Sequence, residues 1–384
     1  MKGVSVRNGR MIVASLMAMA AFTVTSADVS LVHRRSFNLV PLFTDTLAAG
    51  DVAFDGTNVY VSAWNSGSGA QTVSLVRLGS LSSMLSASSG DWTTFDWRVD
   101  LTQAGGSRDT RLVYHNNRLY WGAGLGDGTQ ANTGIRRYDL SGNLDTSWSG
   151  DGNLSLNDAL VSRYDTIDID PGTGGGATLA VGVFNSTIVR RFSLTNGSNA
   201  GNAGPVGGQT STRDYAFAPN GDLYIRTQGR VSKATRVNDT TFNTPVNLAS
   251  WSEGSLAQAF VAYIPISTEF YSGFSDLVLY NQRVSGQNKV FIIRPDGSVF
   301  GELNGLEDTG EPAFNEVAFD NTFLNASWGK TADGRMFIFV VKGGTGAAAF
   351  GDRLDIYEVV PEPASLLALG VGLVGLMRLR RRNR

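Results

Sequence analysis

The residues best suited to acid–base or metal chemistry are three aspartates in one short segment, Asp165, Asp168 and Asp170. If residues 166–170 form a strand, Asp168 and Asp170 project from one face, because side chains alternate along a strand. Two carboxylates on one face could hold Ca²⁺ or another divalent ion through hard oxygen ligands. Carboxylates that cap an exposed strand end show the same spacing, so a metal site and a structural role both stay open.

Other common catalytic groups are scarce. The chain has no cysteine and only two histidines, His33 and His115. Disulfides, thiolate metal sites and a cysteine nucleophile are therefore excluded, and a histidine zinc site or a Ser-His-Asp triad is hard to assemble. We expect both histidines in exposed turns, with His115 as the one candidate base. No catalytic residue is assigned, and the seven tryptophans suit core packing as well as sugar binding.

The segments that would position these residues follow a repeating pattern of short strands. Apolar runs flank turn signals such as Asp55-Gly56, Asn116-Asn117 and Pro219-Asn220-Gly221, each typical of a hairpin. Six such units begin near residues 51, 109, 164, 213, 268 and 315, at intervals of roughly 47 to 58 residues. Two stretches fall outside the pattern. Residues 79–91 are expected to carry one helical turn, and residues 197–208 a surface loop.

Repeats of this length, each made of four short antiparallel strands, predict an all-β fold, a β-propeller of about six blades. Residues 31–40 precede the first unit and are expected to pair into the last sheet and close the ring. A β-sandwich with long loops is the alternative. The fourth unit, Ala216 to Ile225, resembles the strand–turn–strand core of NHL-like and gluconolactonase-like propellers. Lactonases of that type bind a catalytic divalent metal in the channel, but no position here matches their ligands.

The N-terminus has the features of a signal peptide over residues 1–27. Lys2, Arg7 and Arg10 form a positive region before an apolar run at 11–24, and small residues at 25–27 precede a cut before Asp28. A retained membrane helix is the alternative. We expect export across the inner membrane, with a body over residues 28–359.

The C-terminus, residues 360–384, combines three physically different segments. Pro361, Glu362 and Pro363 lie in a motif at 360–364, where the prolines are expected to prevent strand pairing after a body that ends at Tyr357. An uncharged segment at 364–377 is apolar but shorter than the roughly 20 residues of a full membrane span. The tail at 378–384 carries the arginines that would stay in the cytoplasm: Arg378, Arg380, Arg381, Arg382 and Arg384.

This order of motif, short hydrophobic helix and arginine cluster resembles the PEP-CTERM sorting signal of Gram-negative bacteria. The resemblance implies recognition by an exosortase, a membrane-embedded cysteine protease. It also implies that the helix enters the membrane only until the tail is removed, close to Pro361-Glu362-Pro363. A permanent C-terminal anchor is the alternative. The resemblance covers about the last 25 residues and concerns where the body is sent, not what it does.

The charge of the body narrows its partners. Three of the 32 Lys and Arg residues lie in the first 27 positions and five in the last seven, and one of the 34 acidic residues is Glu362. Residues 28–360 therefore carry 24 basic and 33 acidic side chains, a net charge of about −9. An acidic surface disfavours nucleic acid. We expect a binding or structural protein of the cell surface or extracellular matrix, with exopolysaccharide or surface proteins as partners. A lactonase-like, metal-dependent hydrolase is the alternative.

Overall fold

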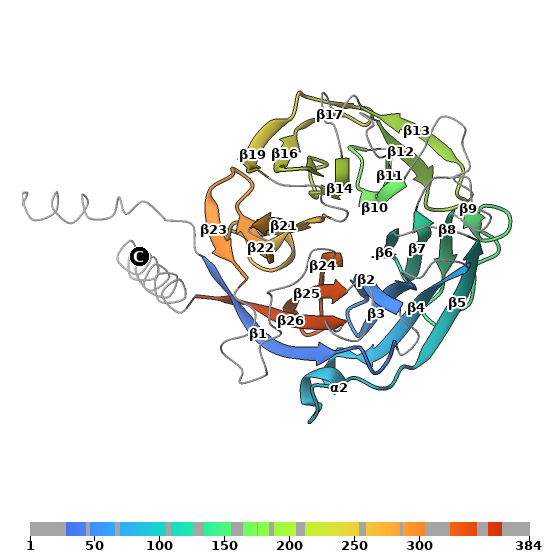
Figure 1. The fold of residues 1–384 in the computed structure, drawn as a ribbon. Coiled ribbons are helices and arrows are strands. Elements are labelled where there is room, and N and C mark those ends of the chain that lie inside the picture. The colour runs from blue at the N-terminus through green and yellow to red at the C-terminus, as the bar shows by residue number, and fades with distance from the viewer. Residues whose placement is uncertain are drawn as a thin grey trace, which may run out of the picture.

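The body is a six-bladed β-propeller. This computed structural model describes residues 28–43, 47–65, 70–104, 109–125, 134–154, 164–174, 176–183, 188–204, 212–252, 259–284, 287–303, 323–343 and 352–362. Six four-stranded antiparallel sheets stand around a central axis like the blades of a fan (Figure 1). The predicted propeller is confirmed, and the β-sandwich alternative is wrong, because the strands form six separate sheets instead of two.

The blades follow one another along the chain. Blade 1 is β2 (Leu47–Phe54), β3 (Asn58–Asn65), β4 (Ala70–Ser80) and β5 (Trp97–Ala104). Blade 2 is β6 (Asp109–His115), β7 (Arg118–Leu125), β8 (Gly134–Tyr138) and β9 (Asn153–Leu154). Blade 3 is β10 (Tyr164–Asp170), β11 (Thr178–Val183), β12 (Val189–Ser193) and β13 (Asn199–Ala203). In each blade the first of these strands lies nearest the axis (Figure 1).

Blades 4 and 5 keep this order with small additions. Blade 4 is β14 (Thr212–Phe217), β15 (Leu223–Thr227), β16 (Arg230–Ala234) and β19 (Val246–Ser250), with β17 (Arg236–Asn238) and β18 (Thr241–Phe242) as a separate hairpin. Blade 5 is β20 (Val261–Ile264), β21 (Leu277–Val284), β22 (Gln287–Ile293) and β23 (Val299–Glu302). The helix α2 (Leu81–Ser86) follows β4, and α3 (Ile266–Glu269) follows β20.

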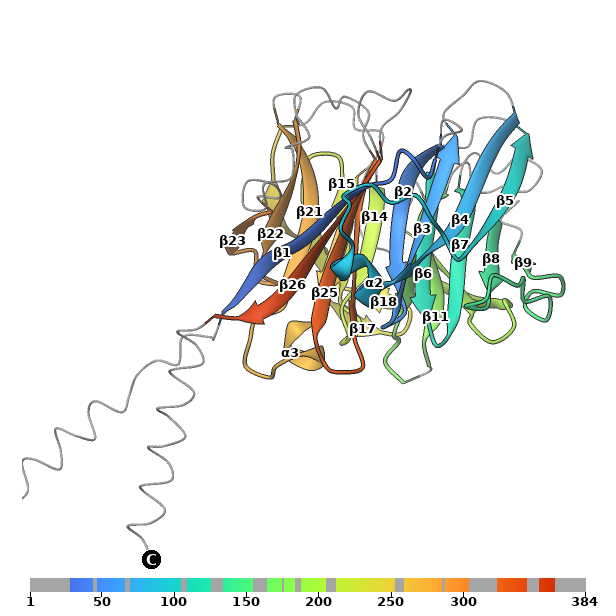
Figure 2. The ribbon, with the colours of Figure 1, turned by 90° about the horizontal axis from the view of Figure 1, so that it is seen from below.

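Blade 6 joins the two ends of the body. It consists of β24 (Phe323–Lys330), β25 (Met336–Gly343), β26 (Arg353–Pro361) and, as its outermost strand, β1 (Val29–Asn38). β1 is antiparallel to β26, and the pairing runs from Val29 opposite Pro361 to Asn38 opposite Arg353 (Figure 2). The prediction that an N-terminal strand closes the ring is confirmed. The ring is thus closed by hydrogen bonds between the first and last strands.

Local sequence explains the hairpins. Asn116 and Asn117 have φ values of 47° and 60°, the left-handed conformation that both central residues of a type I′ turn require. The helical turn predicted within residues 79–91 is α2, in which Leu81 and Met84 are buried.

Two expectations about the strands are wrong. Blade 5 begins at Val261 instead of near 268, where α3 lies. The start of the sixth unit predicted near 315 lies outside the described residues. The loop expected at 197–208 contains β13, which pairs with β12 although its sequence is Asn, Ala and Gly. An outer edge strand is paired on one side only and needs few apolar residues, so the apolar pattern did not reveal it.

The core is divided among the blade interfaces. Buried apolar side chains of the described residues form six clusters, each shared by two neighbouring blades. Between blades 1 and 2, for example, Trp64 and Trp121 are almost fully buried, 1% and 0% exposed. Since no blade can bury both of its faces alone, each depends on its two neighbours.

The strand β26 continues into the sorting motif. It ends at Pro361, and the backbone N–H of Glu362 donates to the carbonyl oxygen of Asp28 at 3.1 Å. The expectation that the body ends at Tyr357 and that prolines prevent pairing there is therefore wrong. The segments predicted at 1–27 and 364–377 lie outside the described residues. Within the residues described, no helix has the length and apolar character needed to cross a membrane.

Candidate functional site

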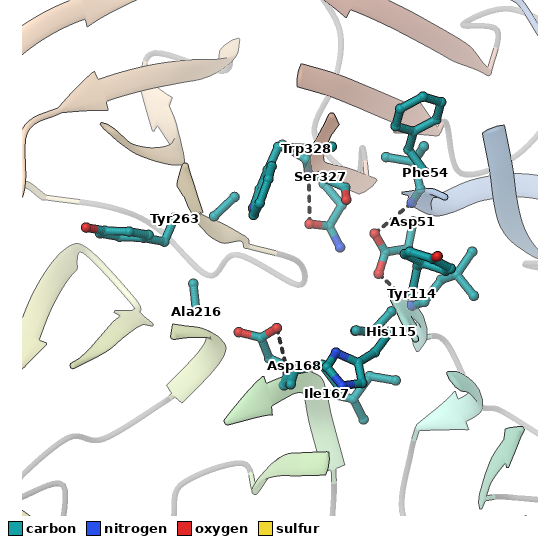
Figure 3. Close-up of a pocket in the computed structure, with 18 of the residues that line it drawn as sticks. Asp51, Phe54, Tyr114, His115, Ile167, Asp168, Ala216, Tyr263, Ser327 and Trp328 are labelled. Atoms are coloured by element: carbon teal, nitrogen blue, oxygen red, sulfur yellow. Dashed lines mark hydrogen bonds between the residues drawn. The ribbon is translucent and has the colours of Figure 1, made fainter. Parts of the chain in front are cut away.

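The central channel contains a cavity of about 610 Å³. Its walls come from the inner strand of every blade, which are β2, β6, β10, β14, β20 and β24. Figure 3 shows these side chains around an open centre, with Trp328 and Asp168 on opposite sides of it. A site at this place draws on all six blades at once, so only a closed ring can form it.

One level of the channel is crossed by a single side chain. Arg111 extends from β6 of blade 2, and its guanidinium lies 3.8 Å from the carboxylate of Asp214 in blade 4. The same guanidinium donates to the carbonyl oxygen of Ala259, just before blade 5, at 3.3 Å. Both side chains are buried. This contact narrows the channel at the end where the inner strands begin. At the other end the cavity reaches the exposed residues Asn116 and Lys330, and we call this end the mouth.

Carboxylates in the wall connect neighbouring blades. Asp51 accepts the backbone N–H of Leu112 in the next blade at 2.7 Å. Two further aspartates do the same at later interfaces: Asp168 accepts from Phe217 at 2.8 Å, and Asp214 from Val261 at 2.9 Å. The inner strand of a blade has one edge toward the channel, where its N–H groups meet no neighbouring strand. These carboxylates satisfy that edge, which explains why charged groups are retained in a buried wall.

Burial changes how these carboxylates titrate. Burial raises the pKa of Asp51 to about 7, although Arg111 and the N–H groups of Leu112 and Val52 lower it. Burial also raises the pKa of Asp168 to about 7, against two backbone N–H donors. The pKa of Asp214 is raised for the same reason, while Arg111 and a hydrogen bond from Thr166 oppose the shift. Near neutral pH the wall can therefore both donate and accept protons.

Aromatic rings and one histidine surround the part of the cavity near the mouth. Trp328, Tyr263 and Tyr114 all line the cavity (Figure 3). Tyr263 donates its hydroxyl to Asp276 at 2.5 Å, so its outer end is already engaged. The side chain of Asn116 lies 2.9 Å from Nε2 of His115, whose pKa burial lowers, so the ring is neutral at neutral pH. The mouth thus combines flat apolar faces with neutral polar groups and with the ion pair of Lys330 and Glu269.

The predicted aspartates have separate roles. Asp168 and Asp170 both reach toward blade 4, as strand alternation predicted, but Asp170 forms a fully buried ion pair with Arg236 at 2.5 Å. Asp165 lies in β10, and its side chain is outside the described residues. In the part of the chain that the structure describes, no three acidic or histidine side chains are arranged to hold a metal ion. Calcium binding stays a hypothesis, as does the metal-dependent hydrolase.

The histidines and tryptophans lie in different environments, some in the core and some in the wall of the cavity. His33 lies within β1 with its side chain 7% exposed and Nε2 2.8 Å from the hydroxyl of Ser36, so the expectation of an exposed turn is wrong for it. His115 does lie at a hairpin end, where it also lines the cavity. Trp64, Trp121 and Trp148 are core residues. Of all seven tryptophans, Trp328 is the one among the lining residues.

Sequence reasoning did not identify Asp51, Asp214 and Arg111 as site residues. A signal was present, because Asp51 and Asp214 occupy the start of a repeat unit, directly before alternating apolar residues. A charged residue at a corresponding place in several units points toward the channel of a propeller. Arg111 starts the second unit in the same way, but no local pattern indicates that it crosses the channel.

The comparisons with known proteins concern mainly the C-terminus. Residues 359–382 match the PEP-CTERM protein-sorting motif. They include Pro361 and Glu362 at the end of β26, together with Pro363 and four of the five tail arginines, which lie outside the described residues. The motif indicates an extracellular protein that is targeted by an exosortase, and the strand pairing shows that its body is a propeller. A search of curated proteins finds no match for the chain.

Solved structures with related folds are distant. Hsv2 of Kluyveromyces marxianus shares 13% identity over 63% of this chain and 64% of that chain, just under two thirds of its length, with a TM-score of 0.33. The catalytic domain of the Coprinopsis cinerea GH62 alpha-L-arabinofuranosidase shares 10% identity over 66% of this chain and 90% of that chain, with a TM-score of 0.40. Neither likeness bears on function, and the six-bladed fold rests on the strand pairing.

Proposed function

We propose that this exported protein is a binding protein of the cell surface or extracellular matrix, and that its channel takes a short saccharide. The observation that carries the proposal is the cavity of about 610 Å³, which places the ring of Trp328 across from the carboxylate of Asp168. Its volume lies within the ~300–1,000 Å³ of small-molecule sites. An aromatic face packs on the apolar side of a sugar ring, while carboxylates accept hydrogen bonds from hydroxyl groups.

The wall favours neutral or amino sugars over uronic acids. Asp51, Asp168 and Asp214 line the cavity. Among the described lining residues, the cation in contact with this group is Arg111, which Asp214 and Ala259 already engage. Each oxygen of Asp168 accepts one backbone N–H and retains a further lone pair for a ligand. As the pH rises through about 7, where Asp51 and Asp168 ionise, a carboxylate on the ligand would meet like charge in a desolvated site, which is costly. The net negative charge of the body also disfavours an acidic ligand.

The route of the protein supports a matrix partner. In this proposal the signal peptide at 1–27 is removed on export, the segment at 364–377 holds the precursor in the membrane, and exosortase cleavage close to Pro361-Glu362-Pro363 frees the body. Sugar polymers are abundant where such a body would act. Exopolysaccharide is then the natural source of the ligand.

Calorimetric titration of the processed protein tests the proposal. The ligands are of two kinds. The first are neutral, amino and acidic monosaccharides, and the second are oligosaccharides from the producing strain's own matrix. We expect binding of neutral or amino sugars, and at least about tenfold weaker binding, about 1.4 kcal/mol, for Trp328→Ala. Trp92→Ala is the matched control, because Trp92 packs against Phe37 outside the channel. No binding of any sugar, or equal binding by Trp328→Ala, would contradict the proposal.

A further inference from the structure

The sorting motif begins inside a folded strand. Pro361 pairs with Val29 of β1, and Glu362 donates its backbone N–H to Asp28. β25 accompanies β26 only as far as Val359. Beyond that point β26 is paired on the β1 side alone, so the N-terminal strand holds the first motif residues in place.

The other side of this strand end is open among the described residues. Hydrogen bonds point alternately to the two sides of an antiparallel strand, and the N–H of Glu362 points toward β1. The N–H that Pro361 lacks would therefore point to the open side, so the proline costs the sheet no ladder bond. The motif is presented as an extended backbone with one open edge, a form that other proteins bind by strand addition.

The position of this strand end depends on a second blade. The carboxylate of Asp28 lies 2.7 Å from the guanidinium of Arg294, which directly follows β22 of blade 5. That guanidinium is in turn 5.3 Å from the centre of the Phe300 ring. Asp28 is the residue that holds Glu362, so the geometry of the motif depends on contact between blades 5 and 6.

We propose that exosortase acts on the closed propeller, and that β1 is the positioning element that presents the sorting motif to it. Cleavage breaks one peptide bond close to Pro361-Glu362-Pro363. With water as the acceptor, the body keeps the new carboxylate and the tail leaves with the new amino group. A chain whose first and last strands have not paired offers the same residues as a loose end and is cut poorly. Release from the membrane then reports completed folding.

The spacing to the membrane supports this order of events. Ala364, where the predicted apolar segment begins, is two residues beyond Glu362. Two extended residues span at most about 7 Å. A protease in the membrane must therefore meet the motif directly beside the folded end of blade 6.

Processing of the full-length chain in a host that carries the exosortase tests the proposal. Ser30→Pro removes the β1 N–H that faces Val360. Ala249→Pro is the control: Trp251, two residues further on, donates its N–H to Gly229, so the N–H of Ala249 also faces β16 and its loss is the same change in the outer strand of blade 4. We expect at least about a tenfold excess of uncleaved over cleaved protein for Ser30→Pro, because the motif loses its preorganised form. Ala249→Pro is expected to be processed normally. Normal processing of a folded Ser30→Pro protein would overturn the proposal.

A locked variant decides the question even if Ser30→Pro fails to fold. Leu31 and Val359 are directly opposite in a non-hydrogen-bonded pair, whose Cα atoms are typically about 4.5 Å apart, within disulfide range. The chain has no cysteine of its own to interfere with Leu31→Cys/Val359→Cys. We expect the cross-linked protein to lose its tail at the wild-type rate, as judged by mass spectrometry. An intact tail on the cross-linked protein would show that the strands must separate first, and would overturn the proposal.

Discussion

The buried carboxylate of Asp51 makes the stability of the propeller depend on pH. Burial raises its pKa from 3.8 to about 7 in the folded protein, and its side chain is 6% exposed. The folded state therefore holds a proton that the unfolded chain releases at lower pH. This stabilisation is complete below about pH 3.8 and is lost as the pH rises through 7.

The size of the effect follows from the two pKa values. Between pH 5 and pH 8 one such group lowers the free energy of unfolding by about 2–3 kcal/mol. Asp168, whose pKa is also about 7, acts in the same direction, and coupling within the channel makes the total smaller than the sum. Hydrogen bonds from Ser147 and the charge of Arg137 lower the pKa of Asp145 to about 2, so its contribution is lost only in stronger acid.

Urea unfolding at pH 5, 6, 7 and 8 measures this slope. We expect wild-type protein to be most stable at pH 5, and Asp51→Asn to reduce the change between pH 5 and pH 8 by about 2–3 kcal/mol. The amide will also lower stability at every pH, because its NH₂ faces a backbone donor, so the slope is the informative quantity. Asp333→Asn, in an exposed turn, is the control. Equal stability of wild-type protein at pH 5 and pH 8, or a wild-type slope in Asp51→Asn, would refute the reasoning.

Two further substitutions test the packing between blades. A Cβ on Gly343 would lie 1.9 Å from the carbonyl oxygen of Ala49, so Gly343→Ala should lower the free energy of unfolding by about 1–3 kcal/mol or more, while Gly301→Ala, with open space around it, should change it little. Arg236→Met removes the partner 2.5 Å from the buried carboxylate of Asp170 and leaves the guanidinium of Arg191 at 3.9 Å, so it should cost up to about 3–5 kcal/mol, measured by urea unfolding. A loss below about 1 kcal/mol would show that Arg191 alone neutralises this carboxylate.

Much of the architecture could be read from local patterns. Turn signals such as Asp55-Gly56 and the spacing of the units predicted a ring of about six sheets, since a hairpin depends on a few neighbouring residues. The errors occur where local signals are weak. β13 has almost no apolar residues, and the strand that begins blade 5 is followed by α3 instead of a tight turn.

The candidate site was less accessible to such reasoning. The sequence pattern predicts Asp168 as one of three metal-ligand candidates. In the structure Asp170 pairs with Arg236, whereas Asp168 lines the channel. The contacts of Arg111 with Asp214 and Ala259 join residues more than a hundred positions apart. Such contacts depend on how the blades are arranged around the axis, which no local pattern reports.

Composition and the local order of residues are enough to identify the sorting signal, the lack of cysteine, the acidic body and the repeat that predicts a propeller. These properties depend on composition and on residues close together in the chain. Two properties became visible only in the fold: Trp328 faces the cavity while other tryptophans are buried between blades, and Pro361 pairs with Val29. Both depend on ring closure. It brings the inner strands of all six blades to one axis and the two ends of the body to one strand pair.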